Sequence, residues 1–146
     1  MLRTEAEYKE ALKRLEQDKA VIAQQRENLK IIPGLTDEEM ERVIQPSLCF
    51  HDQLKEEVAA YERLRRGDFD PINNLTQIGK ILIGTRIALD VPQSLLAQRL
   101  GVSQAVVSRD ERNEYHGVTV EKAQRILEAL GVEISLEISR PLLRAA

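Results

Sequence analysis

The sequence predicts a mainly α-helical protein with three parts: a long helical hairpin, a cluster of short helices, and a short β-strand near the C-terminus. Apolar residues recur at helical spacing along two long segments of the first half, which predicts the hairpin. Short helical segments alternate with turn residues in the second half, and a period-two alternation follows them. Aromatic residues make up only 3% of the chain, so the core is expected to rest on aliphatic side chains, which suit packed helices.

Residues 1–66 are expected to form two antiparallel helices joined by a turn at Pro33-Gly34. Two pairs of residues have the spacing of a capping box, which starts a helix: Thr4 with Glu7, and Thr36 with Glu39. Pro46 is expected to kink or break the second helix, because proline has no N–H to donate. We interpret the hairpin either as a plain helical support or as an oligomerisation or partner surface.

Residues 67–74 concentrate Gly, Asp, Pro and Asn, which favour turns, so they are expected to link the hairpin to a second domain at residues 75–146. Four helices are expected in that domain, over residues 75–89 and 92–100, after Ser103, and over residues 120–130. Gly131 is expected to end the last of them.

Residues 132–138 alternate between apolar and polar side chains and are expected to form a β-strand that Pro141 closes. Its apolar face carries Ile134, Leu136 and Ile138. A single strand needs a partner, and the same strand of a second subunit is the expected one, which predicts a homodimer. The alternative is an extended tail that packs alone.

Composition excludes several classes of protein. The only cysteine, Cys49, cannot form an internal disulfide, and two histidines leave little material for a metal site. No Ser/His/Asp set and no Gly-rich phosphate loop is present, so neither an enzyme nor a cofactor is expected. With no apolar signal region and no run of 18 apolar residues, the expected location is the cytoplasm, without a membrane partner.

Charge does not by itself indicate a nucleic-acid partner. The chain has a net charge of −3, and residues 1–70 carry 12 Lys/Arg and 16 Asp/Glu. Residues 71–146 carry 9 and 8, which gives this half a net charge of +1. Any attraction for DNA must therefore come from where the charges lie rather than from their total.

The most informative segment is Gln93–Arg109. Leu96 and Leu100 lie at the spacing of the inner face of a short helix, and Gly101 stands where that helix must end with a positive φ. Ser103 is of a type that caps a following helix by accepting a backbone N–H. Because only three residues separate the two helices, a large angle between them is expected.

This segment resembles the phage-repressor/Cro-type (Xre-like) helix-turn-helix family over about residues 75–131. The residues that carry the resemblance are Gln93, Leu96-Ala97, Leu100-Gly101-Val102-Ser103, Ser108, Glu111 and Leu127-Glu128-Ala129-Leu130-Gly131. The resemblance implies a repressor-type domain of four to five helices whose helix after Ser103 reads double-stranded DNA in the major groove.

The resemblance also assigns roles to single residues. It implies base contacts from the first turns of the recognition helix, at Gln104, Ala105, Ser108 and Arg109. These types suit the task, because Gln pairs with adenine, Arg pairs with guanine, and Ala can touch a thymine methyl. It implies phosphate contacts from Gln93, Ser103 and Arg112, and a structural ion pair between Arg86 and Glu111.

Three features depart from the family pattern. Asp110 stands where an apolar residue is usual, so it is expected to be exposed or to pair with Arg86 or Arg112. Pro92 replaces a usual capping Ser or Thr. Residues 113–117 form a longer loop than usual, in which Tyr115 and His116 either reach the DNA backbone or cover the loop.

The sequence therefore predicts a sequence-specific transcriptional repressor that acts as a dimer on operator DNA. The segments Thr4–Tyr8 and Tyr61-Glu62 also resemble the helical leader of antitoxins that carry such a domain. That resemblance implies an alternative, an antitoxin that neutralises a protein toxin and represses its own operon. A third interpretation, prompted by the low positive charge, is a protein-interaction module that does not bind DNA.

Overall fold

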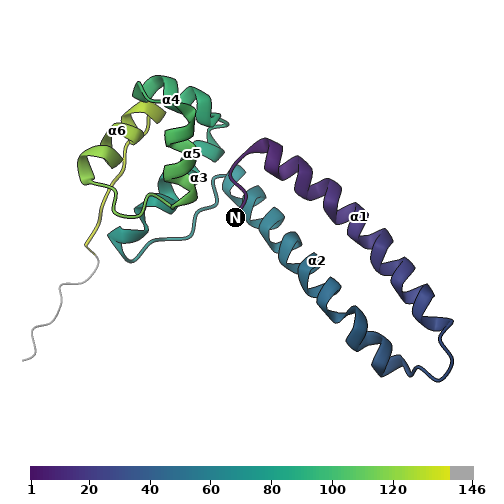
Figure 1. Cartoon of the computed structure of the whole chain (residues 1–146). Helices are drawn as coiled ribbons and strands as arrows, with labels where there is room; N and C mark the ends of the chain where they lie inside the picture. The colour runs from purple at the N-terminus through teal and green to yellow at the C-terminus, as the bar shows by residue number, and fades with distance from the viewer. Residues whose placement is uncertain (139–146) are drawn as a thin grey trace, which may run out of the picture.

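A computed structural model describes residues 1–138 of the chain (Figure 1). Its elements are, in order, α1 (Glu5–Lys30), α2 (Asp37–Arg65), the short 3-10 helix η1 (Leu75–Gln77), α3 (Ile78–Ala88), α4 (Gln93–Leu100), α5 (Gln104–Arg112) and α6 (Val120–Leu130). The long helices α1 and α2 lie side by side and project from a bundle of the short helices α3 to α6. The mainly α fold and the hairpin are thus as the sequence predicts.

Both predicted capping boxes form. The Thr4 side chain accepts from the Glu7 N–H, and the Thr36 side chain accepts from the Glu39 N–H. Of the kink or break expected at Pro46, the break is wrong, because α2 continues through that residue. Proline removes one backbone hydrogen bond, and packing along α1 supplies enough stability for the rest of a 29-residue helix to form around it.

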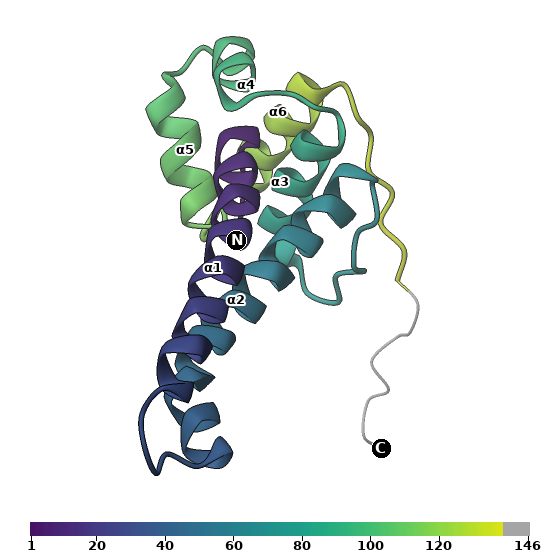
Figure 2. The same ribbon diagram turned by 90° about the vertical axis from the view of Figure 1, so that its right-hand side faces the viewer.

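The core lies within the bundle. Its most deeply buried side chains come from four helices: Leu82, Ile83, Leu96, Val107, Ile126 and Leu127. Tyr61 from the end of α2 joins the same cluster, so the base of the hairpin packs onto the bundle (Figure 2). Gly79 allows α3 to approach the loop before α6, since a Cβ there would lie 1.9 Å from the Glu114 carbonyl oxygen.

The predicted C-terminal strand is wrong for the described residues. Residues 132–138 follow α6 without forming a strand, and no other described segment is a strand that could pair with them. A β-strand is stabilised by hydrogen bonds to a neighbour, so an alternating pattern alone does not create one. Ile134 and Leu136 instead line an apolar groove beside η1 and α6. Pro141, which was expected to close the strand, lies outside the described residues.

Candidate nucleic-acid interface

The turn between α4 and α5 is built by local hydrogen bonds around one glycine. Gly101 adopts φ 69° and ψ 30°, the left-handed conformation that glycine tolerates best. The Val102 N–H donates to the Ala97 carbonyl at 3.0 Å, and the Gly101 N–H donates to the Gln98 carbonyl at 3.2 Å. This pair of bonds is the Schellman motif, which ends α4 and turns the chain sharply into α5.

Helix α5 has one anchored side and one free side. Val107 and Glu111 are buried against the bundle. The residues predicted to contact bases lie differently: Gln104, Ala105 and Arg109 are exposed, and Ser108 is half-buried. The arginine side chain is 73% exposed and only loosely paired, with its Nη2 3.7 Å from the Asp110 carboxylate. The exposed side of α5 therefore presents a donor and acceptor amide, a methyl group and a guanidinium to a ligand.

The residues predicted to contact phosphate lie near the two ends of α5. Ser103 is exposed at the N-cap position, but its side chain makes no capping hydrogen bond, so the predicted cap is wrong. Arg112 is exposed in the last turn of α5, and no acidic partner lies within ion-pair distance of it among residues 1–138.

Glu111 is the centre of a buried polar network. Its side chain is fully buried and accepts from Arg86 Nε and, at 2.8 Å, from Arg86 Nη2. Gln93 Nε2 also donates to it, at 2.7 Å. The Gln93 side chain is thus committed to the network, so a phosphate contact from this residue would use its main-chain N–H in the first turn of α4.

Asp110 has a partner that differs from the two expected from the sequence. Its carboxylate accepts from Lys122 Nζ at 2.7 Å, whereas neither Arg86 nor Arg112 forms an ion pair with it. Lys122 lies in the first turn of α6. The contact ties the last turn of α5 to α6, and it gives the half-buried carboxylate a charged partner.

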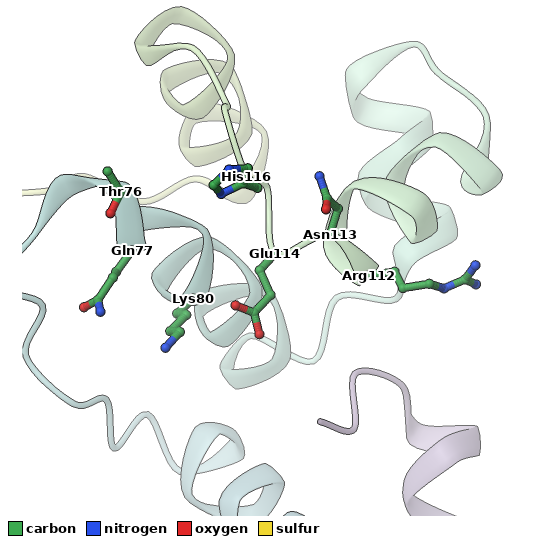
Figure 3. Close-up of a pocket in the computed structure, with 7 residues that line it drawn as sticks. All are labelled: Thr76, Gln77, Lys80, Arg112, Asn113, Glu114 and His116. Atoms are coloured by element: carbon green, nitrogen blue, oxygen red, sulfur yellow. The ribbon is translucent and has the colours of Figure 1, made fainter.

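Sequence reasoning missed a polar pocket of about 450 Å³ beside the C-terminal end of α5 (Figure 3). Its lining residues come from η1, α3, α5 and the following loop: Thr76, Gln77, Lys80, Arg112, Asn113, Glu114 and His116. The Arg112 side chain points away from the other six, toward the outer side of α5. No spacing signal in the sequence joins Lys80 to this loop, because the two are brought together only by the packing of α3.

The loop after α5 covers the core rather than extending from it. Tyr115 is buried and adopts φ 52°, although it is not glycine. Burial, followed by the negative charge of Glu111, raises the pKa of its phenol above the ordinary value of about 10. Its hydroxyl has no hydrogen-bond partner within the described residues. Of the two loop residues considered for DNA contact, only His116 is exposed.

The described residues contain no group of three His, Cys, Asp or Glu side chains that could hold a metal ion. Among the same residues, no helix is both long enough and apolar enough to cross a membrane.

Two short helices set at a sharp turn, with the second exposed along one side, define a helix-turn-helix module. Residues 85–136 match the family model described as Helix-turn-helix. This segment is a Cro-type, Xre-like helix-turn-helix domain, which belongs to a DNA-binding family not known as enzymes. No curated protein and no solved structure matches the chain. The domain indicates DNA as a partner and transcriptional regulation as the class of function.

Proposed function

We propose that this protein is a sequence-specific transcriptional repressor that binds operator DNA as a dimer, with α5 as the recognition helix. The observation that carries the proposal is the division of α5 into two sides. Val107 and Glu111 fix one side to the bundle, while Gln104 and Arg109 stand free on the other. Side chains on a rigid helix can read base edges because their positions are set before DNA arrives.

The dimensions of α5 suit the major groove. An α-helix with its side chains is about 10–12 Å across, and the major groove is about 12 Å wide. Ser103 and Arg112, which are exposed at the two ends of α5, are the proposed contacts to phosphates beside the groove. In this arrangement the ends of α5 position the helix, and Gln104, Ala105, Ser108 and Arg109 supply the sequence preference.

A titration of fluorescent DNA from the protein's own upstream region, against scrambled DNA at two salt concentrations, tests this proposal. We expect the upstream DNA to bind tighter by about 10³ or more. Arg109→Ala should remove most of this preference, whereas Arg125→Ala, which removes an exposed arginine of α6, should lower both affinities about equally. Equal or absent binding to both DNAs would refute the proposal and favour a protein-docking module.

The dimer is supported by apolar side chains that the single chain leaves in water. Leu136 and Ile138 are exposed in the segment after α6, and Ile138 is 89% exposed. Val120 and Leu75 are exposed beside them, along the rim of the apolar groove. We infer that two copies meet at this surface across a two-fold axis, because contact between residues 132–138 of the two copies would remove these side chains from water.

Sedimentation equilibrium at micromolar concentration tests the dimer. The wild-type chain should sediment as a dimer, and Leu136→Lys should sediment as a monomer because it places two charges in the paired segments. Glu133→Gln, in the same segment and changing the charge of the chain by the same amount, should remain a dimer. A wild-type monomer, with and without DNA, would overturn this part of the proposal.

A second function, that of an antitoxin, is favoured by the surface of the hairpin. Residues 43–51 of α2 form a run without a Lys, Arg, Asp or Glu, and Val43 and Phe50 lie in it one heptad apart. Phe50 is 69% exposed and Val43 is 59% exposed, on the part of the molecule that projects from the bundle. Exposed apolar side chains at this spacing suit a helical partner surface.

Copurification with the product of the neighbouring gene tests the antitoxin function. We expect a small basic protein to be retained by the wild-type chain and lost with Phe50→Asp, without a change in operator affinity. Cys49→Asp, at the adjacent exposed position, is the matched control and should retain the partner if the Phe50 face is the interface. No retained protein and no toxic neighbour would rule this function out.

A further inference from the structure

Residues ahead of α1 reach into the polar network that holds the recognition helix. Arg86 is 3% exposed, and its Nη2 donates at 2.7 Å to the carbonyl of Arg3, a residue 83 positions away in the chain. The Arg3 side chain in turn donates from Nη1 to the carbonyl of Glu111, at 3.4 Å. The segment Leu2–Thr4 therefore contacts both the arginine that anchors α5 and the last turn of α5 itself.

The Glu7 carboxylate of α1 helps to hold this segment in place. Glu7 Oε2 accepts from the Arg3 N–H at 2.7 Å and from the Thr4 N–H at 3.2 Å. The capping box of α1 thus does more than start the helix, because it also fixes the direction of the Arg3 carbonyl toward Arg86. A cation near the C-terminal end of α5 is electrostatically favourable, so the Arg3 guanidinium adds to the same contact.

The start of α1, directly after this segment, is fixed to α2. The Tyr8 hydroxyl donates to Glu62 Oε1 at 2.7 Å, and its ring stacks on Tyr61 with centroids 5.0 Å apart. Arg65 forms an ion pair with Glu5 at 3.3 Å. These contacts join the two helices at the base of the hairpin, where Tyr61 enters the core of the bundle. A change in the hairpin base is therefore transmitted to Leu2–Thr4.

The start of α1 also lies beside residues of the proposed DNA interface. Thr4 and Glu5 line a cavity of about 390 Å³ together with Gln93 and Ser94 from the start of α4 and Gln104 from the start of α5. The segment thus contacts the C-terminal end of α5 and lies across a cavity from its N-terminal end.

We propose that Leu2–Thr4 is a positioning strap for the recognition helix, with Arg3 as its central residue. This inference rests on the proposed binding of operator DNA. The strap sets the tilt of α5 through Arg86 and Glu111, and it does not touch DNA. Because Glu111 lies two residues from Arg109, a small rotation at the end of α5 moves the guanidinium out of hydrogen-bonding position. Recognition geometry tolerates only about 0.5 Å of such displacement.

The chain supplies a matched pair of variants to test the strap. Glu7→Ala and Glu39→Ala each remove the carboxylate of a capping box in the hairpin, but only Glu7 holds Arg3. Operator affinity of Glu7→Ala should fall about tenfold, a factor that corresponds to roughly 1.4 kcal/mol. Affinity for scrambled DNA should stay unchanged in both variants, and Glu39→Ala should bind the operator like the wild type. Equal losses in the two variants, or no loss in either, would overturn the strap.

Salt dependence separates positioning from a direct phosphate contact. Arg3→Ala should lower the operator affinity without changing the slope of log affinity against log salt concentration. A phosphate contact would instead lower the magnitude of that slope by about one. Arg14→Ala, which removes an exposed arginine near the start of the hairpin, controls for the lost charge. A slope that falls for Arg3→Ala alone would refute the strap and make Arg3 a DNA contact.

Hydrogen exchange of the free protein tests the strap without DNA. The amides of the last turn of α5 and of Asn113 should exchange about tenfold faster in Glu7→Ala than in the wild type. In Glu39→Ala their exchange rates should equal those of the wild type. If the wild type fails to distinguish operator from scrambled DNA, the proposed function fails while this measurement still decides the strap. Equal protection in all three proteins would refute it.

Discussion

Removing Glu111 should be among the most destabilising single changes in the bundle. Glu111→Ala deprives three N–H donors of their acceptor: Arg86 Nε, Arg86 Nη2 and Gln93 Nε2. Arg86 keeps its bonds to the carbonyls of Val91 and Arg3, but its charge is left buried without a counter-charge. Breaking a buried pair by removing one partner costs about 3–5 kcal/mol, so we expect a loss of about 4 kcal/mol in the free energy of unfolding.

Urea unfolding followed by circular dichroism at 222 nm measures this loss. Thermal unfolding gives a second measure. Each kcal/mol shifts Tm by about 4 °C in a chain of this size, so Tm should fall by roughly 15 °C. Glu128→Ala, which removes an exposed carboxylate from α6, should stay within about 0.5 kcal/mol of the wild type. A loss below about 1 kcal/mol for Glu111→Ala would refute the reasoning, because water would then have to reach Arg86 in the folded protein.

The double variant Arg86→Met with Glu111→Leu separates the cost of an unpaired charge from the value of the pair. Replacing both partners with apolar side chains leaves no buried charge, and such replacements are often neutral. Here the carbonyls of Val91 and Arg3 lose a donor. We therefore expect the double variant to recover about half of the loss, to roughly 2 kcal/mol below the wild type. A double variant as unstable as Glu111→Ala would show that the carbonyl contacts dominate.

Three further predictions concern glycine and tyrosine. Gly79→Ala should destabilise the protein by about 3 kcal/mol, because its Cβ would lie 1.9 Å from the Glu114 carbonyl oxygen. Gly101→Ala should lower the free energy of unfolding by only about 1 kcal/mol, because a Cβ there has no atom within 4 Å and only the positive φ is unfavourable. If urea unfolding shows a larger loss for Gly101→Ala than for Gly79→Ala, both glycine predictions are contradicted. Tyr115→Phe should stabilise by about 1 kcal/mol at pH 7, since it removes a buried hydroxyl that lacks a partner. The raised pKa of Tyr115 means that the unfolded chain releases this proton first, so wild-type stability should fall as pH rises above about 10. Tyr115→Phe should show a shallower fall, and identical pH curves would contradict the assignment.

The parts of the fold that the sequence predicts are those set by neighbours in the chain. Both capping boxes depend on residues three apart, and the turn at Gly101 depends on hydrogen bonds that span five residues or fewer. The errors have a different origin. The effect of Pro46 depends on how strongly α1 supports α2, and a strand at residues 132–138 depends on a partner segment. Neither the support from α1 nor the partner segment can be inferred from the residues next to Pro46 or to residues 132–138 in the sequence.

The candidate site likewise has one part that the sequence predicts and another part that depends on distant residues. The family resemblance implies base contacts from Gln104, Ala105 and Arg109, and these three residues are exposed on α5. The partners that fix α5 come from distant positions: Lys122 for Asp110 lies 12 residues away, and Arg3 lies 108 residues from Glu111. Such pairs follow from tertiary packing, so the spacing of residues along a single sequence gives no means of finding them.

The contacts of Arg3 couple the helical hairpin to the helix-turn-helix domain. If the strap sets the tilt of α5, a protein that moves the base of the hairpin alters operator affinity. By thermodynamic linkage, operator DNA then alters the affinity for that protein by the same factor. A hairpin that served only as a support would not need the residues ahead of α1 bonded to the network behind α5. The base of the hairpin is therefore the place where binding of a partner to α1 or α2 would be converted into release or retention of DNA.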